Sequence, residues 1–204
     1  NLTNLKFVSC SALFGGAVYV YAISEYHVVD IKECEFEKNE VTSTSGTFFG
    51  GSAIYLTVLD ASVSGCTFLN NRGKGGSLKV TENFEDAPLI NNQQSELLAA
   101  QHFNTKGTIQ ISRCNFEINQ NDQCSLFYSY GNKPIRTVVR DCIFTGKLSK
   151  NSHHVDGQSN AVAVPNINFQ NCKFSSDLKH ALNQKAIKVE LKDQVFNYGN
   201  IKEN

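Results

Sequence analysis

Carboxylates are the side chains in this sequence that could cleave a polysaccharide. Glycoside hydrolysis needs two of them about 5–9.5 Å apart, and a calcium-dependent reaction needs a similar group of oxygen ligands. Glu33 and Asp141 occupy equivalent places in a repeated pattern, but Gly65 and Arg113 occupy that place in the copies between them. We therefore expect no catalytic residues and no enzyme, and keep a polysaccharide lyase or hydrolase as the alternative.

Metal chemistry would need several His, Cys, Asp or Glu side chains that converge on one point. The densest such cluster is the run His153, His154 and Asp156. Adjacent histidines in an extended chain point to opposite sides, and no second pair of ligands accompanies them. We expect a solvated turn at this place, and neither a metal nor another cofactor.

Cysteine is the remaining reactive residue type, with seven copies in the chain. Five of them share one position, two residues before a phenylalanine: Cys34, Cys66, Cys114, Cys142 and Cys172. Side chains stacked in register point the same way, which makes a disulfide torsion awkward, so we expect small apolar thiols in the core. Cys10 and Cys124 lie outside this set, and a disulfide between them stays open.

The cysteines belong to an internal repeat that recurs about every thirty residues. In each copy apolar residues or cysteine stand seven, five and two positions before a phenylalanine, and polar residues or glycine stand three and four positions before it. The phenylalanines are Phe7, Phe36, Phe68, Phe116, Phe144, Phe174 and, in a less regular copy, Phe196. The period of two predicts strands, and the polar pair predicts a corner between them.

Units of this length and composition cannot bury their apolar side alone, so they must stack on one another. We predict an all-β fold, a right-handed single-stranded parallel β-helix (a solenoid) of about six to seven coils, in one domain over residues 1–204. Because the sequence begins inside a repeat, we expect it to be an excerpt of a longer chain. The interval between Phe68 and Phe116 predicts an insertion at 82–106 with a short helix, which either binds a partner or covers a strand.

Two further ladders follow from the repeat. The rings of Phe36, Phe68, Phe116, Phe144 and Phe174 are expected to stack in the core, each worth about 2 kcal/mol or more. Asparagine lies three residues after the phenylalanine in three copies, as Asn39, Asn71 and Asn119. There we expect hydrogen bonds along the stack and a left-handed backbone at the asparagine.

Short glycine motifs alternate with these asparagine motifs. They are Gly-Gly-Ala-Val-Tyr at 15–19, Gly-Ser-Ala-Ile-Tyr at 51–55 and Gly-Gly-Ser-Leu at 75–78, between the Phe-x-x-Asn segments at 36–39, 68–71 and 116–119. Together they resemble the GGA(I/L/V) and FxxN repeats of the polymorphic outer-membrane-protein family. Similar repeats also occur in surface proteins of some protists. The resemblance implies a β-helical passenger segment of a cell-surface protein with a role in adhesion.

A row of aromatic residues is expected to face outward from the strands after the glycine motifs. It contains Tyr19, Tyr55 and Phe127, with Lys79 in the same row. If the units stack in register, these side chains form a surface stripe that could contact a partner protein or the apolar face of a sugar.

The charge balance bears on the class of partner. Nineteen Lys and Arg residues balance nineteen Asp and Glu residues, which argues against a nucleic-acid partner. No apolar run is long enough, at about 18 residues, to span a membrane.

We expect a non-catalytic structural or adhesive segment of a larger cell-surface or extracellular protein, in contact with other segments of its parent and with a protein or glycan partner. A scaffold subunit of a large intracellular assembly is a further alternative, because the cysteine column is typical of reduced thiols. Asn1-Leu2-Thr3 matches a glycosylation acceptor, so Asn1 could carry a glycan outside the cell.

Overall fold

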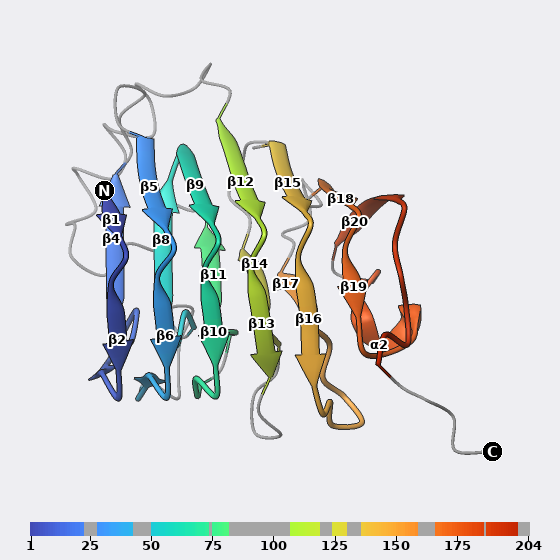
Figure 1. Ribbon diagram of the computed structural model, residues 1–204, viewed down its shortest axis with the longest axis horizontal. Coiled ribbons are helices and arrows are strands. Elements are labelled where there is room, and N and C mark those ends of the chain that lie inside the picture. Colours follow the sequence, from blue (N-terminus) through green and yellow to red (C-terminus); the bar gives the residue numbers. More distant parts are fainter. Residues whose placement is uncertain are drawn as a thin grey trace.

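The computed structural model describes residues 1–22, 28–42, 50–73, 75–81, 107–118, 124–129, 136–158, 166–185 and 187–199. These residues are mostly strands in parallel sheets, which confirms the all-β parallel fold, and they include one short helix, α2 (Leu178–Ala181). Figure 1 shows the strands side by side in chain order, from the blue N-terminal end to the red C-terminal end. The insertion predicted at 82–106 lies outside the described residues.

Successive repeat units place their strands next to one another in the same sheets. The first sheet has the order β1 (Leu2–Thr3), β5 (Val28–Lys32), β9 (Asp60–Ser64), β12 (Thr108–Ser112), β15 (Arg136–Arg140), β18 (Asn166–Gln170) and β20 (Lys188–Lys192). The second has β2 (Lys6–Val8), β6 (Glu35–Glu37), β10 (Thr67–Leu69), β13 (Asn115–Ile118), β16 (Ile143–Gly146) and β19 (Lys173–Phe174).

The third sheet is formed by the strands after the glycine motifs. Its order is β4 (Val18–Ala22), β8 (Ile54–Val58), β11 (Leu78–Thr81), β14 (Leu126–Ser129) and β17 (Val155–Gln158). A small fourth sheet pairs β3 (Ser11–Ala12) with β7 (Glu40–Val41). The chain therefore returns to each sheet one strand further along, and each unit rests on the one before it.

The corner between the first and second sheets is a single residue with a positive φ. The seven corner residues are Asn4, Glu33, Gly65, Arg113, Asp141, Asn171 and Asp193, with φ between 49° and 64°. This backbone region is unfavourable for a residue with a side chain. Each of the first six donates its N–H to a carbonyl of the next unit, as from Glu33 to Ser64 at 2.9 Å. That bond helps to hold the corner in place.

Pairing keeps equivalent residues opposite each other through the stack. Phe68 pairs with Phe36 on one side and with Phe116 on the other. The less regular seventh copy also keeps this register, because Val189 lies opposite Ile167 and Phe196 stacks on Phe174 with ring centroids 5.4 Å apart.

Phenylalanine rings form the central column of the core. From Phe7 to Phe174 each ring lies nearly parallel to the next, with centroids 4.6–5.2 Å apart. The column from Phe36 to Phe174 is fully buried, and apolar residues of the first and third sheets surround it. Such stacking separations lie within the favourable range for aromatic pairs.

Candidate functional site

The five repeat cysteines line the interior beside the phenylalanine column. They are at most 2% exposed, and all seven cysteines are in the thiol form, so Cys10 and Cys124 do not form a disulfide. Each repeat thiol points at the carbonyl two residues earlier, as from Cys114 to Ser112 at 3.3 Å. From Cys66 onward each also approaches a carbonyl of the preceding unit, such as Cys172 to Val139 at 3.5 Å.

These contacts make the thiols hydrogen-bond donors at the corner. The carbonyl two residues before each repeat cysteine also accepts the backbone N–H of the preceding unit's corner residue, as that of Ser64 does from Glu33 at 2.9 Å, so the thiol is a second donor to it. Contact with Cys114 and burial raise the pKa of the Cys66 thiol. Contacts with Cys114 and Cys172, together with burial, raise the pKa of the Cys142 thiol. Neutral thiols are the form that can donate to these carbonyls.

Gln194 takes the cysteine position in the seventh unit and makes the same contacts. Its amide nitrogen donates to the carbonyl of Lys192, two residues earlier, and to that of Phe169 in the preceding unit. Its amide oxygen accepts from the N–H of Cys172 at 2.9 Å. From Cys66 onward the repeated position therefore carries a donor that reaches back one unit.

Asparagine side chains join the first three units on the other side of the phenylalanine. The Asn71 amide oxygen accepts from both the backbone and the side chain of Asn39 at 3.0 Å, and its nitrogen donates to Phe36. The Asn39 amide oxygen accepts from the backbone N–H of Cys10, and its amide nitrogen donates to the carbonyl of Phe7. Positive φ falls on Lys38 and Asn70, the residues before Asn39 and Asn71, which corrects the expectation that these asparagines themselves are left-handed. Asn119 lies outside the described residues.

The aromatic row is in register but does not form an exposed stripe. Tyr19, Tyr55, Lys79 and Phe127 are successive partners in the third sheet. Tyr55 is 1% exposed, Lys79 2% and Phe127 7%, and Tyr19 is half-buried. The expectation of a surface stripe is therefore wrong for these residues. The alternation of side chains along a strand shows that these residues point away from the core side of the sheet. It does not show whether the opposite side of the sheet is exposed to solvent.

Contacts within the row are close. The Tyr19 and Tyr55 rings meet edge to face at 5.3 Å. The Lys79 Nζ lies 4.5 Å from the centre of the Tyr55 ring and 5.8 Å from that of Phe127. A desolvated ammonium group is attracted by aromatic faces, so these contacts offset part of the cost of burying a lysine.

His154 is buried, in contrast to the solvated turn expected there. It is 0% exposed. The centroid of its ring lies 6.1 Å from that of Phe144 and 6.3 Å from that of Phe174. Its Nε2 lies 3.3 Å from the Ser175 Oγ. Its Nδ1 has no hydrogen-bond partner, and burial lowers the pKa of His154 to about 4. The imidazole is thus a neutral core residue. No set of three possible ligands for a metal ion occurs in the described part of the chain.

The two carboxylates considered for catalysis do not converge. Glu33 and Asp141 are both corner residues but stand three strand spacings apart, about 14 Å. The Asp141 carboxylate accepts from Asn171 at 2.8 Å. Asp30 lies 2.7 Å from the Lys32 Nζ, and Asp60 caps the N–H of Thr108 at 2.7 Å. Asp141, Asp30 and Asp60 thus make contacts at corners and strand ends.

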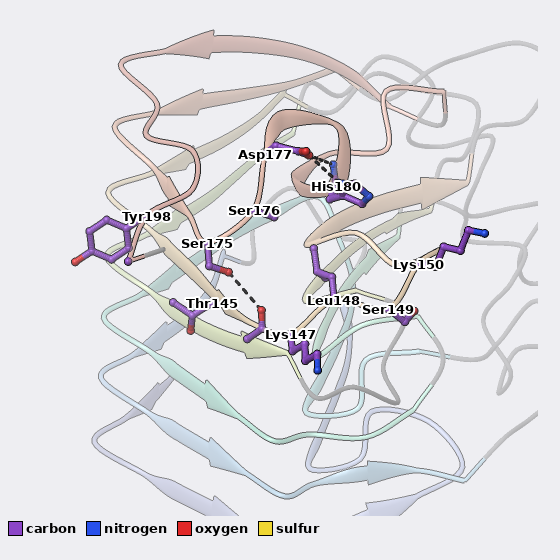
Figure 2. Close-up of a pocket in the computed structure, with 12 residues that line it drawn as sticks. Thr145, Lys147, Leu148, Ser149, Lys150, Ser175, Ser176, Asp177, His180 and Tyr198 are labelled. Carbon is purple, nitrogen blue, oxygen red and sulfur yellow. Dashed lines mark hydrogen bonds and ion pairs between the residues drawn. The ribbon is translucent and has the colours of Figure 1, made fainter. Parts of the chain in front are cut away.

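Two open hollows lie at the C-terminal end of the stack, beside α2. The first, about 750 Å³, is lined by Thr145–Lys150, Ser175–Asp177, His180, Tyr198 and Gly199. Figure 2 shows the lysine-bearing loop after β16 on one side and the α2 segment on the other. The second, about 860 Å³, shares Lys150 and His180 with the first, so the two adjoin. We call this combined depression the α2 groove.

Sequence reasoning did not identify the α2 groove, because its walls come from loops of different units. One signal was present in the sequence. Between residues 142 and 187 there are five lysines, Lys147, Lys150, Lys173, Lys179 and Lys185, but only two acidic residues, Asp156 and Asp177. In a chain with balanced charge, that span has a local excess of positive charge.

No family model, curated protein or solved structure matches the chain. The resemblance to polymorphic outer-membrane-protein repeats thus stays a prediction that depends on the motifs. None of the helices described here has the length and apolar character needed to cross a membrane.

Thiol reactivity can be measured directly. Under native conditions N-ethylmaleimide should modify Cys10, which is partly exposed, before any other cysteine, because the thiols of the other six are buried. Mass spectrometry should find one adduct before unfolding and seven after unfolding in guanidinium chloride. Modification of Cys114 as fast as Cys10 would contradict the buried ladder.

Substitution of Tyr55 by serine tests the burial of the aromatic row. We expect Tyr55→Ser to lower the free energy of unfolding by about 3–5 kcal/mol, because it leaves a cavity and removes a ring from Lys79. Urea denaturation followed by circular dichroism measures this. Tyr198→Ser is the matched control: Tyr198 is 39% exposed, and its loss should cost about 1 kcal/mol or less. Equal effects of the two substitutions would refute the assignment of Tyr55 to the interior.

The buried histidine predicts a pH dependence. Because the pKa of His154 is about 4 in the folded chain and about 6.5 when unfolded, protonation favours unfolding. The contribution of neutral His154 to the free energy of unfolding is fully present above pH 6.5. It falls by about 3 kcal/mol as the pH drops to 4.

The variant His154→Leu removes the ionisable group and places an apolar side chain in the core instead. Urea denaturation at several pH values should show that the wild type loses about 3 kcal/mol more than the variant between pH 7 and pH 4. Parallel pH profiles for the two proteins would show that His154 is not buried in its neutral form.

Proposed function

We propose that the parallel sheets belong to one right-handed, single-stranded β-helix that serves as a rigid, non-catalytic segment of a larger cell-surface or extracellular protein. In this role the stack holds loops and strand faces in fixed positions, which lowers the entropic cost of contact with a protein or glycan.

One observation carries this proposal: the chemically reactive side chains make contacts that hold neighbouring units together. The thiols from Cys66 onward and the ladder asparagines are hydrogen-bonded between units, and the carboxylates of Asp141 and Asp60 have structural partners. The resemblance to repeats of surface proteins adds the location and the adhesive role. This arrangement favours a structural segment over a polysaccharide-cleaving enzyme.

The thiols favour a second candidate, a scaffold subunit of a large intracellular assembly. Extracellular proteins that contain many cysteines generally use them for disulfides. Here all seven are thiols, and six of them are buried. Burial also protects thiols from oxidation, so a surface protein can retain them.

Surface labelling of intact cells separates the two candidates. A membrane-impermeant amine-reactive biotin reagent should label exposed lysines of the parent protein on intact cells of the source organism, and peptides of this segment should appear among the labelled products. Lysed cells give the total amount of the protein, and an abundant cytoplasmic protein controls for leakage. Labelling only after lysis would refute the surface role and support the intracellular scaffold.

A further inference from the structure

The α2 groove concentrates positive charge that has no partner in the described part of the chain. Lys147, Lys150, Lys179 and Lys185 line it, and all four are exposed. None of them forms an ion pair with a described carboxylate. Lysines near the other end of the stack behave differently, since Lys6, Lys32 and Lys38 each lie within 2.7 Å of a carboxylate oxygen.

The acidic residue in the groove is hydrogen-bonded within α2. Asp177 caps α2 by accepting from the backbone N–H of His180 at 2.9 Å, and its carboxylate lies 2.8 Å from the Nδ1 of the same histidine (Figure 2). These backbone and side-chain contacts with His180 lower the pKa of Asp177. Asp156, nearby in sequence, accepts from Asn183 and Gly157 at 2.7 Å. Lys179 also contributes to the low pKa of Asp177. Lys147, Lys150 and Lys185 have no carboxylate partner among the described residues and are left for a ligand outside the chain.

Hydroxyl groups line the rest of the first hollow. They belong to Thr145, Ser149, Ser175, Ser176 and Tyr198. The hydroxyls of Thr145, Ser149 and Ser175 donate within the chain, so their oxygens remain as acceptors, and the Ser176 Oγ is buried without a hydrogen-bond partner. Hydroxyl groups both donate and accept hydrogen bonds, which suits a ligand with many hydroxyls of its own.

We propose that the α2 groove binds an acidic polysaccharide. The lysines contact its carboxylate or sulfate groups, and the serine, threonine and tyrosine hydroxyls contact the hydroxyls of its rings. This proposal rests on the proposed function, since it names the ligand class of a rigid segment at the cell surface.

Other polyanions fit the groove less well. Single-stranded nucleic acid binds through aromatic platforms for several bases, and Tyr198 is the one aromatic residue in the walls. Peptides commonly add a strand to an open sheet edge through main-chain bonds. The groove instead presents side chains from loops and from α2, which lies on the C-terminal side of β19.

The test measures binding of the purified chain to immobilised polygalacturonate at low salt. The variant carries Lys147→Ser and Lys150→Ser, and the matched control carries Lys188→Ser and Lys192→Ser on β20, outside the groove, with the same change in charge. We expect the groove variant to bind on the order of ten-fold more weakly and the control to change by about two-fold or less. Binding should weaken as salt rises.

Circular dichroism of each variant checks that the fold is intact. Equal losses in the groove variant and the control would show that binding depends on net charge, and this would overturn the site. Equal or tighter binding of poly-L-glutamate would replace the polysaccharide by an acidic peptide, and absence of polygalacturonate binding would refute the ligand class. Surface labelling of cells tests the location independently, so a failure there is distinguishable from a failure of the groove.

Discussion

The structure depends on the left-handed corner of each unit, because the corner residue of each of the first six units donates its N–H to a carbonyl of the next unit. The corner joins the first and second sheets, and from the second unit to the sixth a buried cysteine thiol points at the carbonyl two residues before it. A cysteine two residues before the phenylalanine is small and apolar enough to pack there, and its thiol still donates a hydrogen bond. In the first unit Leu5 takes this position and is 42% exposed, so water can reach it.

This use of side chains leaves the outer surface to carry contacts with partners. The phenylalanine column, the thiols and the asparagines stabilise the stack from within, while the α2 groove adds charge and hydroxyls at one end. A stack built in this way has little need for particular residues on its exposed loops. Binding properties can therefore differ from one unit to the next without changing the interior, which is the division of labour we propose for this chain.

Local patterns in the sequence predicted the strands and corners, because these features depend on residues that are close in the sequence. Period two and the polar pair gave the strands and the corner, and the phenylalanine spacing gave the register, including that of Val189 in the seventh copy. Burial that depends on distant contacts was not predictable in this way. Tyr55 points away from one sheet face and yet is covered, and His154 is enclosed by rings from two units. The α2 groove escaped prediction because no single segment contains it.

The pairing of Phe68 with Phe116 spans the longest interval between repeats, yet Thr67–Leu69 and Asn115–Glu117 remain in register. The length of chain between two units is thus uncoupled from their spacing in the stack. One extra residue within a strand would reverse the faces of the residues after it. Evolution of such a chain should proceed by duplication or loss of whole units and by changes in the length of the connections, while the register within the strands is kept.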